Sequence, residues 1–156
     1  MPTTDVDLYR LTQTDYDKFL NAIQRPPDAA GWWVSSGTPV GGVLGDHPAQ
    51  EVTIVAFTGN IDAHRAELRS LWGGPVCVVQ HKHSKAELEE VARSLNGPGS
   101  KQLDLGVRFG GGPDPVNDNV FFDVVAVTPA MQQAVDQKYG AGVVELRGAL
   151  AAVASP

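Results

Sequence analysis

Residues 76–91, VCVVQHKHSKAELEEV, join an apolar run directly to an amphipathic helix. The run is short and rich in β-branched residues, which is typical of a strand buried on both faces. The helix carries its own signals, because Ser84 and Glu87 have the spacing of a capping box, and Gly97 with Pro98 ends it. A buried strand that leads straight into a helix implies parallel strands joined by a crossover helix.

The segments around this junction extend the same pattern. We predict strands at 51–57 and 102–109, a helix at 62–72, a hairpin loop at 110–118 with its return strand at 119–127, a helix at 129–139 and a last strand at 143–150. From residue 75 onward the order is β-α-β-β-α-β, the split βαβ arrangement of ferredoxin-like domains. We therefore predict an α+β fold, a ferredoxin-like sandwich with one sheet, an extra N-terminal β-α unit and three helices largely on one face.

The first fifty residues have a different character. Thr12 marks the start of a short helix, and Pro26 and Pro27 end it because neither can donate a backbone hydrogen bond. A strand at 32–34, hairpinned to residues around Val43, is predicted next. The expected domains are a helix-and-hairpin appendage at 1–50, an α/β sandwich at 51–150 and a tail at 151–156.

An internal repeat supports this interpretation. When the chain is shifted by 67 residues, LRSLWGGPVCVV falls on VDQKYGAGVVEL, so that Trp72 matches Tyr139 and Gly73 matches Gly140. In each copy a helix ends in an aromatic residue, a glycine follows and a β-branched strand begins. Either an ancient duplication or repeated use of one helix-to-strand joint accounts for the match.

The charge and composition of the chain exclude several partners. The formal net charge is −6 and the basic residues are scattered, whereas nucleic acid and anionic membranes are bound by clustered Lys and Arg. No apolar run approaches the roughly 20 residues that span a bilayer, and the first residues lack the apolar stretch of a signal peptide. The single Cys77 cannot form an internal disulfide and is expected to be buried. These features favour a cytoplasmic protein that binds neither nucleic acid nor membrane.

Two histidines follow the predicted strand at the junction. His81 and His83 lie at a strand's carboxyl end, where open α/β sheets bind ligands. If the preceding strand pairs with this one in parallel, Asp62 and His64 emerge at the same edge, and either of them completes a set of three zinc ligands with His81 and His83. The alternative is an ordinary strand-to-helix junction, because the spacing His-x-His is nonspecific and His64 lies on the apolar stripe of its helix, pointing inward. Zinc is the one cofactor that this pattern suggests.

Two further sets of residues are candidate binding sites. Trp32 and Trp33 are adjacent, so in a strand one faces the core and the other is available to anchor a partner. In the loop at 110–118, the oxygen atoms of Asp114, Asn117 and Asp118 are candidate contacts for calcium. Their spacing is not that of an EF-hand. The alternatives are that the N-terminal helix covers both tryptophans and that the loop is a flexible hairpin tip.

The closing passage VTPAMQQAVDQKYGAGVVELRGAL resembles the last segment of small bacterial α+β proteins of unassigned activity. These proteins end in a strand, a helix finishing in Tyr-Gly and a valine-rich strand. The resemblance extends back to LWGGPVCVVQHKHSKAELEEV and covers about the last two thirds of the chain. It implies a fold and brings no activity with it.

The chemistry of the chain favours a protein that is not an enzyme. We find no activated nucleophile, no paired buried carboxylates and no strong metal motif. We therefore predict a non-catalytic, soluble binding or assembly domain that acts through the open face of its sheet or through the loop at 110–118. Its partner is another protein or a second copy of the chain. The alternative is a zinc-binding protein or metal-dependent hydrolase that uses the histidine cluster.

Overall fold

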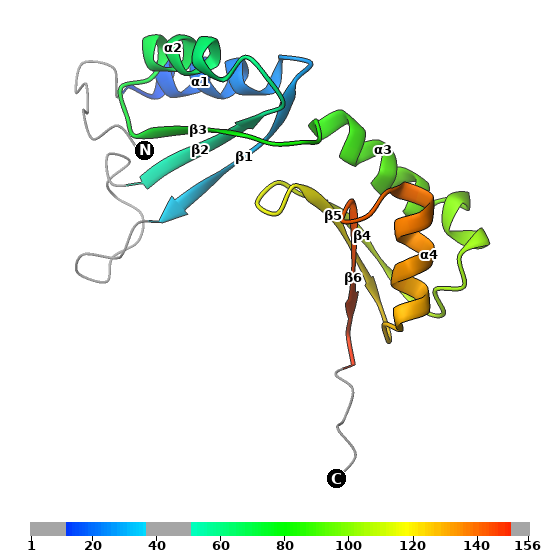
Figure 1. The fold of residues 1–156 in the computed structure, drawn as a ribbon. Helices are drawn as coiled ribbons and strands as arrows, with labels where there is room; N and C mark the ends of the chain where they lie inside the picture. The colour runs from blue at the N-terminus through cyan, green and yellow to red at the C-terminus, as the bar shows by residue number, and fades with distance from the viewer. Residues whose placement is uncertain (1–11, 37–50, 151–156) are drawn as a thin grey trace. The chain divides into compact units, whose positions relative to one another are not determined.

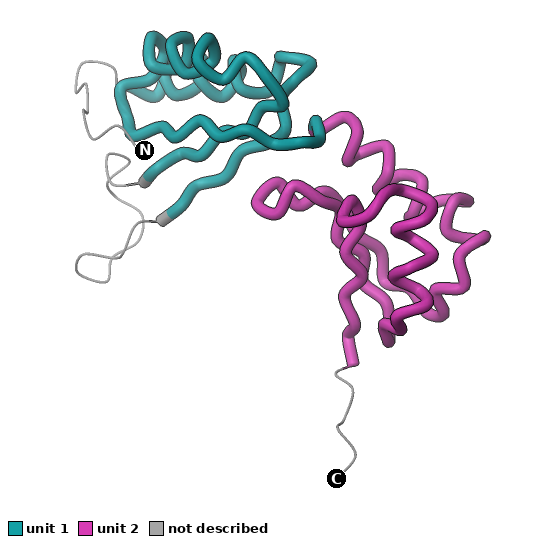
Figure 2. The backbone as a smooth tube through the Cα atoms, viewed as in Figure 1, with its two compact units in different colours: residues 1–84 teal, residues 85–156 magenta. Residues whose placement is uncertain are grey.

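The computed structural model describes residues 12–36 and 51–150, and the chain forms two compact units, residues 1–84 and residues 85–156 (Figures 1 and 2). The first unit contains α1 (Gln13–Gln24), β1 (Ala29–Ser36), β2 (Glu51–Phe57), α2 (Ile61–Leu71) and β3 (Val76–Gln80). The second contains α3 (Lys85–Asn96), the 3-10 helix η2 (Pro98–Gln102), β4 (Arg108–Asp114), β5 (Asn119–Val124), α4 (Pro129–Tyr139) and β6 (Val144–Gly148). In the described residues the fold is therefore α+β, with four α-helices and two three-stranded mixed sheets. None of these helices is both long and apolar enough to cross a membrane.

The first sheet has the strand order β1-β2-β3. β1 pairs with β2 antiparallel and β2 pairs with β3 parallel, so the predicted parallel pairing of the two buried strands is confirmed. Both helices pack on one face of this sheet and form one core with its inward residues. The buried members are Phe19, Ile23, Ala29, Val55, Phe57, Leu68, Trp72, Val76 and Val78.

The second sheet repeats this arrangement with the order β4-β5-β6, an antiparallel pair followed by a parallel pair. Helices α3 and α4 again share one core with the inward residues of the strands. Its buried members are Leu88, Ala92, Leu95, Leu105, Val120, Phe122, Val124, Val135, Val143, Val144 and Leu146.

Local sequence signals set the helix boundaries as predicted. Thr12 caps α1 by accepting a hydrogen bond from the Asp15 N–H at 3.2 Å, and the helix ends before Pro26. Thr128 caps α4 in the same way, and Pro129 occupies its first turn, where a missing N–H costs nothing. These signals act within a few residues, so they do not depend on which strands pair.

The two units share one architecture down to a local irregularity. Each runs α-β-β-α-β, and the first strand of each carries a bulge at the same place in its register. The bulge holds a glycine of positive φ, Gly31 at 144° in β1 and Gly110 at 109° in β4. Glycine adopts such angles at low cost. The repeat seen at the ends of α2 and α4 thus belongs to a repeat of the complete unit, which favours duplication over reuse of one joint.

The predicted single ferredoxin-like sheet is not confirmed, because β3 pairs with β2 while β4, β5 and β6 form a separate sheet. The antiparallel partner of β2 comes from residues 29–36, within the segment predicted to be an appendage. The compact units accordingly divide between Ser84 and Lys85, which differs from the expected boundary near residue 50. Val43, the centre of the predicted hairpin partner, and the tail at 151–156 lie outside the described residues.

The strand predicted at 102–109 lies later in the chain. Leu103 and Leu105 alternate with polar residues because both pack against the core. The segment that contains them is not part of a β-strand. The observed strand runs from Arg108 through the glycines to Asp114, so that only residues 115–118 remain as the turn. A Cβ atom on Gly111 would lie 2.0 Å from the carbonyl oxygen of Phe121. Glycine at this position therefore permits the close approach of β4 to β5.

Candidate functional site

His64 points inward from the start of α2. Its Nε2 lies 2.9 Å from Oδ2 of Asp28, and its ring stacks on Phe57 with 3.7 Å between centroids. Its Nδ1 lies 4.0 Å from Oε2 of Glu67, and 13% of the side chain is exposed. Both ring nitrogens thus face carboxylates of the same unit, the inward arrangement expected from the apolar stripe.

Asp28, which sequence reasoning missed, organises this cluster. Its carboxylate receives a second, longer hydrogen bond from Nδ2 of Asn60 at 3.4 Å, and its backbone carbonyl accepts the N–H of Thr58 at 2.9 Å. The hydrogen bond with His64 is the main cause that lowers the pKa of Asp28 from its ordinary 3.8, against the opposing effect of burial. The cluster ties the start of β1 to the β2–α2 connection. The register between β1 and β2 brings these distant residues together, and no local pattern signals it.

The other predicted zinc ligands occupy separate environments. His81 and His83 follow β3 at the rim shared with the β2–α2 connection, because β2 and β3 are parallel. The ring of His81 stacks on Trp33 with 5.8 Å between centroids. Asp62 is exposed and pairs with Arg65 at 2.5 Å. Across the described part of the chain, no group of three or more His, Cys, Asp or Glu side chains is placed to hold a metal ion.

Asp114 builds the β4–β5 turn. Its carboxylate accepts hydrogen bonds from the backbone N–H groups of Val116 at 3.0 Å and Asn117 at 3.3 Å, from Asn117 Nδ2 at 3.0 Å and from Arg147 at 2.9 Å. Burial acts to raise the pKa of Asp114, but the hydrogen bonds from Asn117 and Arg147 outweigh it and the pKa is lowered. Asp118 adopts a left-handed φ of 54° in the same turn. The hydrogen-bonding capacity of Asp114, predicted to serve an external group, is thus used within the hairpin and by Arg147.

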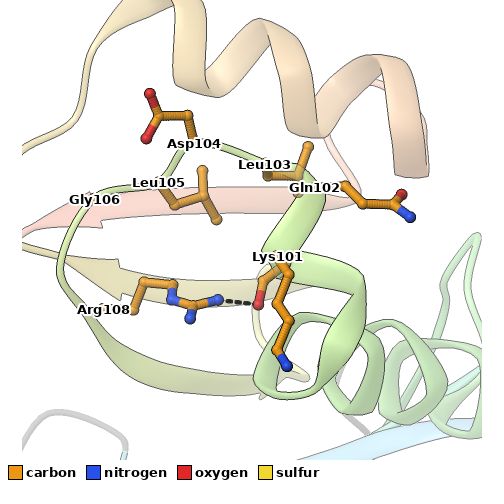
Figure 3. A pocket seen from close by; sticks show the side chains of 8 residues that line it. Lys101, Gln102, Leu103, Asp104, Leu105, Gly106 and Arg108 are labelled. Atoms are coloured by element: carbon orange, nitrogen blue, oxygen red, sulfur yellow. Dashed lines mark hydrogen bonds between the residues drawn. The ribbon is translucent and has the colours of Figure 1, made fainter.

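A pocket of about 520 Å³ lies beside η2, lined by residues 100–106 and Arg108 (Figure 3). The guanidinium group of Arg108 donates a hydrogen bond to the hydroxyl of Ser100. Asp104 lies on the side of the pocket away from Arg108. The lining holds no histidine, no cysteine and no pair of carboxylates.

The face of the first sheet that points away from α1 and α2 is apolar. Trp32 packs against the core, while Trp33 lies on the opposite face, as adjacent strand residues must. The register places Ile54 beside Trp33, and Cys77 beside Ile54, with Val79 two residues further along β3. Trp33, Ile54, Cys77 and Val79, hereafter the apolar face, are all partly exposed. Cys77, predicted to be buried, therefore reaches the surface.

The corresponding face of the second sheet is charged. It carries Asp123 from β5 and Glu145 and Arg147 from β6. Arg147 lies 4.7 Å above the ring of Phe121 and pairs with Glu145 at 3.2 Å and with Asp114 at 2.9 Å. A sheet face of this kind is typical of one that water solvates. Two units of one architecture thus present faces of opposite chemistry.

No protein-family model matches this sequence, and a search of the curated proteins finds no significantly similar one.

Proposed function

We propose that the protein is a non-catalytic assembly domain whose copies associate through the apolar face of the first sheet. The contrast between the two helix-free faces supports this proposal. Arg147, Asp123 and Glu145 make the second sheet's face suitable for contact with water, whereas the four described residues of the apolar face carry no charge. Uncharged apolar surface of this kind marks interaction sites on proteins.

The charge of the chain favours a second copy as the occupant of this face. With a net charge of −6, two copies repel one another over most of their surface. The apolar face contains none of that charge, so it is a region where two copies meet without repulsion. Sheets pack face to face roughly 10 Å apart with interdigitating side chains, and Trp33 and Ile54 supply the bulk for such a contact.

The contribution of Ile54 is large enough to measure. Burying a complete aliphatic side chain contributes about 1.5–3 kcal/mol, so the exposed part of a partly buried one contributes about 1 kcal/mol. A two-fold contact contains Ile54 twice, which gives about 2 kcal/mol, or roughly a 30-fold change in Kd. Replacement by glutamine puts a polar side chain of similar size in its place and removes most of this gain.

Sedimentation velocity over a range of concentrations tests the proposal, with Ile54→Gln as the variant and Phe121→Gln as its control. Phe121 occupies the corresponding position of β5, on the charged face. We expect Ile54→Gln to weaken association about 30-fold and Phe121→Gln to leave it unchanged. The Cys77 thiol, which belongs to the apolar face, should react more slowly with a thiol reagent as protein concentration rises. Equal association of both variants, or a monomer whose Cys77 reacts at one rate throughout, would contradict the proposal.

The two alternatives from the sequence have their own tests. Val116, in the loop at 110–118, is 56% exposed, and a loss of association in Val116→Gln alone would assign the contact to the loop. Elemental analysis of untagged protein tests zinc binding. Zinc near one equivalent, lost in His81→Ala, would support the metalloprotein alternative.

A further inference from the structure

Side-chain amides close both outer edges of the second sheet. At the β4 edge, Asn96 donates from Nδ2 to the carbonyl of Gly111 at 3.0 Å and accepts the Gly111 N–H at 3.2 Å. An antiparallel neighbouring strand would make the same pair of bonds. At the β6 edge, Gln132 donates to the carbonyl of Val144 at 2.8 Å and accepts the N–H of Leu146 at 3.1 Å. This second pair reproduces the bonds of a parallel neighbour.

Pro113 closes the β4 edge further. The backbone N–H of Val120 donates a hydrogen bond of 2.8 Å to the carbonyl oxygen of Val143, on the β6 side. Its partner in β4 is Pro113, whose nitrogen therefore points to the outer edge, where it has no hydrogen to donate. Proline and capped backbone groups on an edge strand prevent another strand from pairing there.

In the first sheet, the backbone groups of Trp32 and Val34 point to the outer edge of β1. The backbone N–H of Thr53 donates to the carbonyl oxygen of Pro75 at 3.0 Å, so the backbone groups of Thr53 point toward β3. Its partner in β1 is Val34, and Trp32 lies two residues before it. Because backbone groups alternate in direction along a strand, both residues direct their N–H and C=O groups outward. Among the described residues, none donates to or accepts from these groups.

The first unit lacks the closing residues at the corresponding positions. Gln24 ends α1 as Asn96 ends α3, yet Gln24 is exposed and makes no side-chain hydrogen bond with the described residues. In α2, the turn that corresponds to Gln132 holds His64 and Arg65, which bond Asp28 and Asp62 instead of the edge of β3. Val34 occupies the position in β1 that Pro113 occupies in β4. Val34 pairs with Thr53 and Pro113 pairs with Val120, and these two partners are the first buried residues of β2 and β5.

We propose that β1 is a strand-addition edge that pairs antiparallel with β1 of a second copy. The strand AAGWWVSS carries no charge, so a two-fold pairing places no like charges opposite one another. It has eight residues, against five in β3 at the other edge. A two-fold pairing joins β1 of one copy to β1 of the other, so neither β1 edge remains available to a third copy. The result is a dimer and not a fibre. This contact goes beyond the proposed function, since it involves the edge of the sheet and not the apolar face.

Proline at position 34 is the decisive substitution. Val34→Pro removes one outward N–H, leaves the ladder to β2 intact and installs the residue that β4 has at the corresponding position. Val34→Thr keeps the N–H and the strand preference and is the matched control. Val34→Lys is a second variant that keeps the backbone and introduces like charges near the two-fold axis; the native side chain is 40% exposed, so the fold tolerates it.

Sedimentation velocity of the full chain and its variants, with hydrogen exchange of the Trp32 and Val34 amides, tests the pairing. We expect Val34→Pro and Val34→Lys to raise Kd about 10-fold or more and Val34→Thr to change it less than about 3-fold. In the wild-type protein the two amides should become protected as concentration rises. The edge contact alone gives a dimer, and the edge with the apolar face gives a tetramer.

Several results would overturn the inference. They are a wild-type monomer at all concentrations, association that Val34→Pro and Val34→Lys leave unchanged, protection of the two amides that does not depend on concentration, and open-ended polymers. Association lost in Ile54→Gln but retained in Val34→Pro would reject the edge contact and keep the proposed function. The reverse pattern would reject the apolar face and keep the edge contact.

Discussion

Replacing Gln132 by alanine should open the outer edge of β6 and destabilise the second unit. The Gln132 amide holds the carbonyl of Val144 and the N–H of Leu146, and it also donates to Asp136 at 2.9 Å. Alanine keeps the helix and removes all three bonds. The two backbone groups are then left to water at the edge of the sheet.

The expected loss follows from the bonds removed. A protein hydrogen bond contributes about 0.5–1.5 kcal/mol net, and water can reach this edge, so the two backbone bonds together contribute about 1–2 kcal/mol. Alanine returns about 0.3 kcal/mol through its higher helix propensity. Gln133, the next residue of α4, is exposed and makes no such bonds, so Gln133→Ala measures the propensity gain alone.

Urea unfolding of both variants, with hydrogen exchange at Leu146, separates these effects. Gln132→Ala should lose about 1–2 kcal/mol relative to Gln133→Ala, and its Leu146 amide should exchange about 10-fold faster. Equal stability of the two variants, with unchanged exchange at Leu146, would refute the view that this amide stands in for a neighbouring strand.

Two other substitutions test the packing and electrostatics described above. Gly111→Ala places a Cβ 2.0 Å from the carbonyl oxygen of Phe121, whereas a Cβ on Gly112 meets nothing within 4 Å. Thermal unfolding should show that Gly111→Ala lowers the free energy of unfolding by about 2 kcal/mol. Gly112→Ala should change it little. Asp28→Asn should cost about 1 kcal/mol near pH 6 by weakening the bond to His64. Because the folded-state pKa of Asp28 is lowered, its stabilisation is present above pH 3.8 and lost as the pH falls through the folded value. The difference between wild type and Asp28→Asn should therefore narrow below pH 3.8, and a constant difference in acid unfolding would contradict this assignment.

Features set by neighbouring residues could be predicted from the sequence, and features set by strand pairing could not. The caps at Thr12 and Thr128 and the opposite faces of Trp32 and Trp33 depend on a few consecutive residues, and they are found as expected. The partner of β2 lies across residues 37–50, and the local pattern does not choose between a strand on that side and one from the second half of the chain. β4 lies later in the chain than its sequence pattern predicts, because its glycines have no strand preference of their own, and β5 and Asn96 supply their hydrogen bonds.

The same distinction explains why the open edge of β1 is not visible in the sequence. The repeat is visible where the two copies agree, at the joint where Trp72 follows α2 and Tyr139 ends α4. The edge contact depends on positions where the copies differ, such as Val34 against Pro113. Neither residue is a motif, and each has meaning only when the register shows that its backbone points outward. After a duplication, the second unit keeps the amides that close its edges, and the first unit lacks them at the corresponding positions. Two-fold pairing of β1 with β1 of a second copy gives a closed dimer, whereas open edges on both units would allow copies to join without limit.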